Sequence, residues 1–348
     1  MPLICRPFSV NSYAISKIWF RTHSVDLRTG DIASITSLCK SYIYQDMLEK
    51  PSELVLYRKV DHGGLGLHNI KCKALASLLT TFLQTAASTR FQQSLYHNSL
   101  YRYYCLGDDS LAKPDMPPYY TQSFFDVIKK VKENSPLNPV NMSVKQWYDY
   151  LLEEEVTMEV VDDEGRLQPK KCRVELLAPS NDWSKSFYLS RLRGLSTEIR
   201  SFTFKLIHQL LPFNQRLNQF LPNNREDCQL CSAHYPESPL HGLFRCEKNN
   251  DAAQFLLHLT RPYDSTITEE NVLLFNLNCE PMYEVPTMLV LATGLNLIWQ
   301  NRINKKGTTL YQIRAEIECL VSLLRRSRSK KLREAGNMVN NTLTNFPL

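Results

Sequence analysis

The sequence predicts a mostly α-helical fold of many helices, interrupted by an irregular connector and a small zinc-stapled module. Three observations lead to this prediction. Apolar residues recur at helical spacing along most of the 348 residues, and little of the chain alternates with period two. A stretch rich in tyrosine and proline, from about 88 to 142, breaks that pattern. Four residues between 228 and 246 have the spacing of metal ligands.

The chain is expected to begin with a helical unit over 1–90. Apolar residues at helical spacing predict helices within 12–48, and Pro51 ends that run because proline cannot continue a helix. Residues 54–57 are expected to form a short extended segment. The stretch 70–87 carries a wide apolar face of leucine, alanine and phenylalanine, which is typical of a buried helix.

A connector rich in tyrosine and proline is expected over 91–170. Short helices are predicted near 122–133 and 144–152, where apolar residues return at helical spacing. Proline and polar residues elsewhere in this range favour irregular backbone. The pair Asp162 and Asp163 lies in an acidic stretch that is expected to form an exposed turn.

Two further units are expected after the connector, a zinc-binding unit over 171–262 and a C-terminal helical unit over 263–348. Helices of the zinc-binding unit are expected to break at Gly194 and Pro212. Later helices are predicted over about 250–259, 269–276, 285–303 and 308–342. The last of these has an apolar stripe on one face and a basic cluster on the other.

The most specific motif is Cys228-x2-Cys231-x9-His241-x4-Cys246. Three thiolates and an imidazole match the four ligands of a closed tetrahedral Zn²⁺ site, and a C-x2-C knuckle presents two sulfurs across one tight turn. The alternative is three buried cysteines near a surface histidine, since free cysteine packs like a small hydrophobe. We favour one structural zinc ion, which stabilises the fold and leaves no open position for chemistry.

The residues around the histidine are compatible with such a site. Ser238 and the proline after it are expected to begin a short helix, with the serine as its cap. His241 would then lie in the first turn, and Cys246 beyond the end of the helix. Leu243 and Phe244 are expected to cover the metal ion.

Composition narrows the class of protein. A chain of this length with 43% hydrophobic residues can bury two or three ordinary cores. No apolar run reaches the roughly 18 residues needed to span a bilayer. Seven cysteines outside the motif show no metal-ligand spacing, which indicates reduced thiols. We expect a soluble intracellular protein without a membrane partner, in the nucleus or alternatively the cytoplasm.

One basic cluster lies near the C-terminus, on the helix predicted over 308–342. It consists of Arg325, Arg326, Arg328, Lys330, Lys331 and Arg333. Because the net charge is only +6, a nucleic-acid surface must come from such local clustering. Each phosphate that is neutralised releases counterions, so binding would depend on salt and be largely independent of sequence.

A second, weaker basic set lies between 170 and 200. It contains Lys170, Lys171, Arg173, Lys185, Arg191, Arg193 and Arg200. Lys185, Arg191 and Arg193 are the members expected to contact nucleic acid, because aromatic residues nearby offer base stacking beside phosphate contact. Both basic sets have an alternative interpretation as solvated helix faces or as a nuclear-import signal.

Two segments carry a family pattern. The first joins the Lys-Ile-Trp run 17–19 to the Gly-Gly-Leu-Gly-Leu run 63–67 and the alanine-rich stretch after it. The second leads from Trp183 through the aromatic-rich run 202–212 to the knuckle and the Glu-Ser-Pro-Leu-His block 237–241. In this order they resemble the thumb and the zinc-binding segment of non-LTR (LINE-type) retrotransposon reverse transcriptases. The resemblance covers about half of the chain.

Two glycine-containing positions differ from known sequence motifs. The family usually has H-L-F-x-x-C, whereas here Gly242 follows His241 and keeps the H-x4-C spacing, so the packing around the zinc is expected to differ. The run 63–67 is not a phosphate-binding loop, because Asn69 stands where G-x-G-x-x-G needs its third glycine. We expect a turn with positive φ there.

The resemblance implies the nucleic-acid-binding C-terminal portion of a reverse transcriptase, as a fragment or a retained remnant. In the family the catalytic aspartates lie upstream of the thumb, and only about fifteen residues precede the thumb-like start here. The run Leu106-Gly107-Asp108-Asp109 imitates a polymerase Y-x-D-D hairpin but lacks a partner aspartate on a strand. No endonuclease motif is evident. We therefore predict no catalytic residue and no enzymatic activity.

RNA, DNA or both are the partners that this interpretation implies, with binding independent of sequence. The alternative is a protein–protein interaction module in which zinc only stabilises the fold and the basic face binds an acidic protein. A third alternative is a non-functional relic that folds partially. The sequence does not identify a protein partner.

Overall fold

The protein is described by a computed structural model that covers residues 1–22, 27–45, 47, 50–88, 92–117, 120–134, 138–161, 167–169, 171–178, 183–189, 192, 194–221 and 223–346. Over these residues it consists almost entirely of helices, with one short β-hairpin. The prediction of a mostly α fold is therefore confirmed. None of the described helices is both long enough and apolar enough to cross a membrane.

The chain forms two compact units, and each unit is assembled from segments that are discontinuous in sequence. Unit 1 comprises Met1–Cys5, Asp46–Leu65 and Lys171–Leu348. Unit 2 comprises Arg6–Gln45 and Gly66–Lys170. The four predicted ranges 1–90, 91–170, 171–262 and 263–348 are contiguous, so the first of them contributes to both units.

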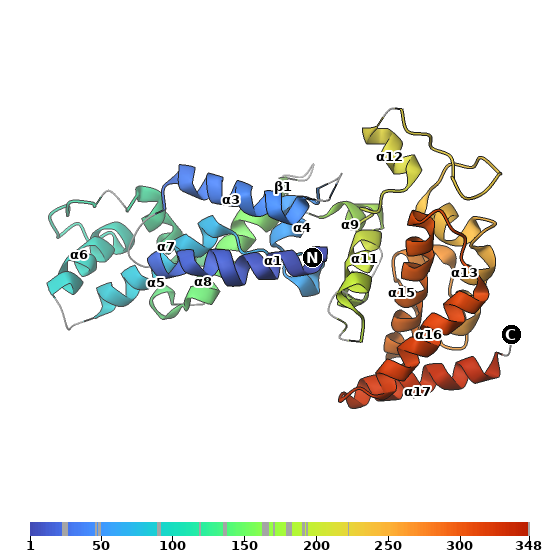
Figure 1. Ribbon diagram of the computed structural model, residues 1–348. Coiled ribbons are helices and arrows are strands. Elements are labelled where there is room, and N and C mark those ends of the chain that lie inside the picture. The colour runs from blue at the N-terminus through green and yellow to red at the C-terminus, as the bar shows by residue number, and fades with distance from the viewer. Residues whose placement is uncertain are drawn as a thin grey trace. The chain divides into compact units, whose positions relative to one another are not determined.

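Unit 2 is organised around helix α5. Its elements are α1 (Arg6–Ser9), η2 (Val10–Ile15), α2 (Ser16–Thr22), α3 (Thr29–Tyr44), α5 (Ile70–Ala87), α6 (Gln92–Leu106), α7 (Gln122–Asn134), η4 (Pro139–Asn141), α8 (Val144–Leu152), η5 (Glu153–Thr157), β1 (Met158–Val161) and β2 (Leu167–Pro169). α5 packs against α2, α3, α6 and α8 (Figure 1). The helices predicted over 70–87, 122–133 and 144–152 correspond to α5, α7 and α8 and are confirmed.

Helix α6 lies where the sequence favoured irregular backbone, so that expectation is wrong. The reason is aromatic packing. The ring of Tyr104 on α6 stacks on Phe125 of α7, with centroids 4.7 Å apart. Phe125 in turn packs against Phe82 of α5, with centroids 5.6 Å apart. Burial of these rings outweighs the modest intrinsic helix propensity of tyrosine.

A short antiparallel hairpin follows α8 and η5. Strand β1 pairs with β2, with Val160 opposite Gln168. The predicted acidic turn with Asp162 and Asp163 falls between the two strands, outside the described residues.

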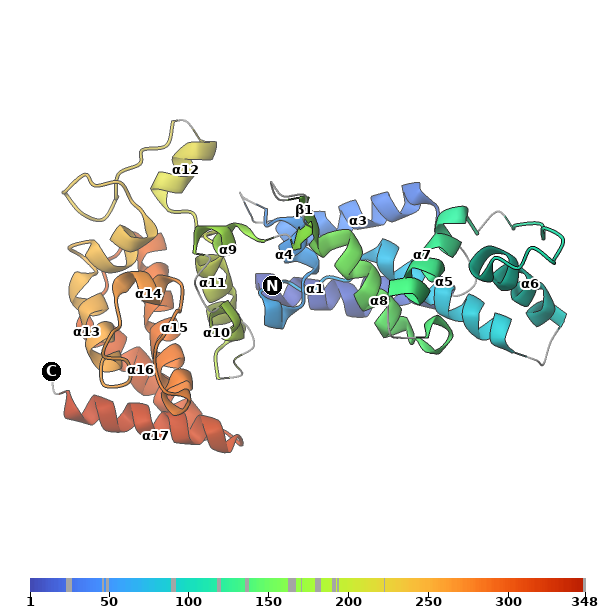
Figure 2. The ribbon, with the colours of Figure 1, turned by 180° about the vertical axis from the view of Figure 1, so that it is seen from behind.

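Unit 1 is organised around helix α15. Its elements are η1 (Leu3–Cys5), α4 (Glu53–Tyr57), η3 (Val60–His62), α9 (Arg173–Leu177), α10 (Trp183–Tyr188), α11 (Thr197–Ile207), α12 (Asn214–Phe220), η7 (His241–Arg245), α13 (Asn250–Thr260), α14 (Glu269–Leu273), α15 (Pro281–Ile303), α16 (Leu310–Arg325) and α17 (Lys330–Asn345). α15 packs against α11, α13, α16 and α17 (Figure 2). Most residues from Val285 to Trp299 are buried, as expected for a central helix.

Two expectations for unit 1 are wrong. Residues 54–57 are not extended but form helix α4, because Ser52 caps the turn and all four residues are buried. The helix predicted over 308–342 is two antiparallel helices, α16 and α17, which pack closely on each other. Gly336 makes this approach possible, since a Cβ atom there would lie 2.9 Å from Cβ of Leu324.

The glycine-rich run forms the turn that was predicted. Gly63 has φ +79° and Gly66 has φ +69°, which glycine adopts at little cost. A Cβ atom on Gly63 would lie 2.5 Å from the ring of Phe187. The Gly63 carbonyl oxygen lies 2.8 Å from Nε2 of His208, a buried histidine at the end of α11. Gly63 is therefore packed within unit 1, whereas Gly66 begins a segment of unit 2.

Candidate metal centre and basic turn

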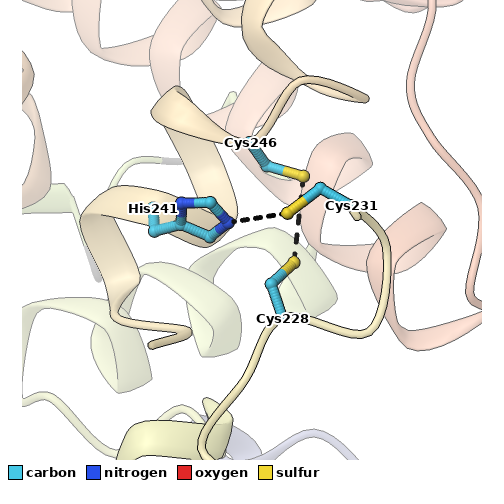
Figure 3. Close-up of side chains that lie close together, drawn as sticks. All are labelled: Cys228, Cys231, His241 and Cys246. Atoms are coloured by element: carbon cyan, nitrogen blue, oxygen red, sulfur yellow. Dashed lines mark hydrogen bonds between the residues drawn. The ribbon is translucent and has the colours of Figure 1, made fainter. Parts of the chain in front are cut away.

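The four predicted metal ligands converge on one point (Figure 3). Cys228 and Cys231 come from the loop after α12, whereas His241 begins η7 and Cys246 follows it. Their ligand atoms all lie within 4.8 Å of one another. The Sγ atoms of Cys228 and Cys246 are 3.8 Å apart, and Sγ of Cys231 is 3.4 Å from Nε2 of His241. The cluster could hold a single metal ion, and it is the one such group that the described residues contain.

Local backbone structure presents these side chains. The Cys228 amide donates to the Tyr235 carbonyl at 2.9 Å, which closes the loop that carries the knuckle. Oγ of Ser238 accepts from the His241 amide at 3.1 Å, so the predicted serine cap is confirmed. The Cys246 amide donates to the His241 carbonyl at 2.8 Å, and this bond ends the helical turn and places the last sulfur opposite the knuckle.

The packing around the centre explains Gly242. A Cβ atom at this position would lie 2.7 Å from Cε1 of Phe213, so any larger residue would push η7 away from that ring. Leu243 and Phe244 are completely buried, but neither joins the cluster formed by the three cysteines. The hydrophobic side chain that packs against the sulfurs is Leu230. The expectation that Leu243 and Phe244 cover the metal is therefore wrong.

A buried ion pair connects the loop between α12 and η7, which we call the metal-binding loop, to α15. Glu237 is 1% exposed, and its Oε1 accepts from Nε of Arg302 at 2.9 Å. Oε2 of Glu237 accepts from the Asn214 amide at 3.1 Å, which fixes the start of α12. The Arg302 guanidinium lies over the rings of Phe213 and Trp299, 5.3 and 5.0 Å from their centroids. One carboxylate thus joins the metal-binding loop, α12 and α15.

A buried asparagine makes a second connection. Asn249 is completely buried, and its Nδ2 donates to the Gly242 carbonyl at 2.9 Å. Its Oδ1 accepts from the Thr308 amide at 3.0 Å, just before α16. Neither the Glu237–Arg302 pair nor the Asn249–Thr308 pair could be predicted from local patterns, because the residues of each pair are more than fifty positions apart.

The proximity of the ligands changes their acidity. A hydrogen bond from the Cys246 thiol lowers the pKa of Cys228, and the same bond raises the pKa of Cys246. Burial raises the pKa of Cys231. The thiols of Cys231 and Cys246 therefore ionise readily only when a cation lies beside them. A bound metal ion would supply that cation.

The predicted basic cluster lies on the turn between α16 and α17, which we call the basic turn (325–333). It is not on one helix face as expected, since α16 ends at Arg325 and α17 begins at Lys330. Figure 1 shows this turn at a corner of unit 1. All six cationic side chains are exposed. Nη1 of Arg333 donates to the carbonyls of Ser327 and Arg328, at 2.9 and 3.0 Å, and so closes the turn.

The second basic set is placed only in part. Arg191 and Arg193 lie outside the described residues. Lys185 pairs with Glu284 of α15, with Nζ 3.0 Å from Oε1. Tyr188, an aromatic residue near this set, lies beside the basic turn, with its ring centroid 6.0 Å from Nζ of Lys331.

The Asp108–Asp109 pair follows α6 in a turn. Nε of Arg102 donates to Asp108 at 3.0 Å. Hydrogen bonds from Ser110 and Arg102 lower the pKa of Asp108.

No family model matches the sequence, and no curated protein matches it.

Proposed function

We propose that this chain is a nucleic-acid-binding segment held together by a structural zinc ion, and that it corresponds to the non-catalytic C-terminal portion of a LINE-type reverse transcriptase. The single observation that carries the binding function is the basic turn. Its six cations project from one tight turn, and α17 has no acidic residue in its first turn. The positive end of the helix dipole adds to their field.

Among the described residues, one ion pair opposes this charge. Lys330 and Glu334 form an exposed pair with 3.8 Å between Nζ and Oε1, and such pairs contribute little. Tyr188 is 38% exposed beside Lys331 and offers a ring on which a base can stack. Cations and an exposed ring together favour a single-stranded nucleic acid, with phosphate contacts that position the chain without selecting a sequence.

Two of the distances between ligand atoms in the metal centre support zinc. In a tetrahedron, Zn–S bonds of about 2.3 Å and Zn–N bonds of about 2.0 Å place two sulfurs about 3.8 Å apart and sulfur and nitrogen about 3.5 Å apart. The distances of 3.8 Å between Cys228 and Cys246 and 3.4 Å between Cys231 and His241 agree. With four protein ligands the ion would stabilise the loop and carry out no chemistry.

The resemblance to reverse transcriptases supplies the biological context. The order of the glycine turn, the aromatic-rich α11 and the metal centre is the order of the family. Asp108 lies in a helix-terminal turn and accepts a hydrogen bond from Arg102, which supports a structural role rather than a polymerase metal site.

The test is a salt titration of binding to a 20-nucleotide single-stranded RNA. Replacing Arg325, Arg326 and Arg328 with Gln should reduce the log–log slope by about 2, because each single-strand phosphate contact contributes roughly 0.7. A control variant replaces Arg261, Lys305 and Lys306 with Gln, three exposed cations of the same unit outside the basic turn. Equal slopes for both variants would remove the basic turn from the proposal.

A further inference from the structure

A small pocket lies between α9, α11 and α12, beside the metal-binding loop. Its polar lining consists of Arg173, Gln209, Gln215, Arg216 and Gln219. The described residues that line it include no carboxylate. The volume is about 130 Å³. Since a single water needs about 10–15 Å³ of such space, an oxyanion fits.

The two arginines come from helices whose starts are fixed. Glu175 holds the start of α9, where its Oε2 accepts from the Cys172 amide at 2.6 Å. Its Oε1 also accepts from Nη1 of Arg58 at 2.8 Å. Arg173 therefore projects from an anchored turn, and ordering an arginine costs less when its backbone is already fixed.

The second arginine is positioned by the metal-binding loop. Arg216 lies on α12, whose first residue, Asn214, donates its amide to Glu237. Nδ2 of Asn214 also donates to the Asp227 carbonyl at 2.8 Å, next to the first metal ligand. The amide of Gln215 donates to the Glu237 carbonyl at 3.3 Å. The loop that carries the metal centre thus determines where this side of the pocket lies.

We propose that this pocket, which we call the arginine pocket, binds a phosphate group of the nucleic acid. Arginine presents several N–H donors in a planar fork that matches phosphate oxygens, and primary amides of glutamine add further donors. Leu206, Leu211 and Phe213 form an apolar part of the lining, beside which the two cations can contact an anion. The inference rests on the proposed function, since it adds a second phosphate site to the basic turn.

The experiment compares wild type with the double variant Arg173→Gln, Arg216→Gln on the same single-stranded RNA. Loss of this one phosphate contact should lower the log–log salt slope by about 0.7. Arg261→Gln serves as the control and should leave the slope unchanged, because this exposed arginine directly follows α13 and lies outside both surfaces. Unchanged zinc content shows that the double variant is folded.

A second readout does not depend on nucleic acid. Inorganic phosphate, added at constant ionic strength in place of chloride, should raise the melting temperature of wild type more than that of the double variant. RNA binding with equal salt slopes in the two proteins would overturn the arginine pocket and leave the basic turn in place. Absence of RNA binding by wild type would overturn the proposed function. In that case the rise in melting temperature with phosphate still tests the arginine pocket by itself. An equal rise in both proteins would overturn the pocket as well.

Discussion

Glu237 and Arg302 form a buried ion pair between the metal-binding loop and the end of α15. The carboxylate is 1% exposed and the arginine side chain 12% exposed. Buried charges are tolerated when they are paired and supported by further contacts. Here the carboxylate also accepts from the Asn214 amide, and the guanidinium lies over the rings of Phe213 and Trp299. The position of the metal centre on unit 1 therefore depends on a contact that involves no metal ligand.

Removing this carboxylate should destabilise unit 1 strongly. Glu237→Ala leaves the Arg302 guanidinium buried without its partner, a change that costs about 3–5 kcal/mol in other proteins. Glu334→Ala is the matched control, because it breaks an exposed pair and should cost less than about 0.5 kcal/mol. Urea unfolding measures both. Similar losses in the two variants would contradict the role assigned to Glu237.

Replacing a cysteine of the metal centre should have a much larger effect than replacing a cysteine outside it. Cys228→Ser should abolish metal binding and lower the melting temperature markedly, because metal-binding energy is folding energy at a closed site. Cys319→Ser should change neither, since that cysteine is exposed and distant in sequence from the motif. Elemental analysis and thermal unfolding give the two readouts. Folded wild type without a bound metal ion would disprove the assignment of the centre.

Two glycine-to-alanine substitutions should differ clearly in their effect on stability. Gly242→Ala places a methyl group 2.7 Å from Phe213 and should cost about 1–3 kcal/mol through overpacking. Gly30→Ala in α3 meets nothing within 4 Å and should be neutral or slightly stabilising. Denaturant titrations compare them. A tolerated Gly242→Ala would mean that η7 does not pack on Phe213 as closely as described.

Unit 1 should lose stability on mild acidification because of His208. Burial lowers the pKa of His208 from its ordinary 6.5 to about 4. The unfolded chain therefore binds a proton between these values that the folded chain does not, and stability present above pH 6.5 is lost as the pH falls. Between pH 7 and pH 5 the loss is about 2 kcal/mol. Urea unfolding of wild type and His208→Gln tests this, and identical pH dependence in both would refute it.

Local patterns in the sequence predicted the features that depend on neighbouring residues. Helices α5 and α8 follow from apolar spacing, and the metal ligands follow from the short intervals between Cys228 and Cys246. The serine cap at Ser238 follows from the same local logic. These features were predictable because the interactions that form them lie within one helix turn or one loop.

Features that depend on distant residues were not predictable. Helix α6 is stabilised by Tyr104, which packs on a ring twenty-one positions later, and the packing of α17 on α16 depends on the close approach at Gly336. A periodicity analysis continues through such a break, because the apolar stripe resumes in the same register. The environment of the basic turn, with Tyr188 beside it, depends on the folded arrangement of unit 1.

The central claim is that this chain binds nucleic acid through exposed basic side chains, and an equilibrium titration of wild type tests it most directly. Labelled single-stranded RNA and double-stranded DNA are titrated with protein at about 50 mM salt and again at about 200 mM salt. We predict binding to at least the RNA, with an affinity that falls steeply with salt and varies little with sequence. No binding to either nucleic acid at the lower salt concentration would contradict the account and favour an acidic protein as the partner of the basic turn.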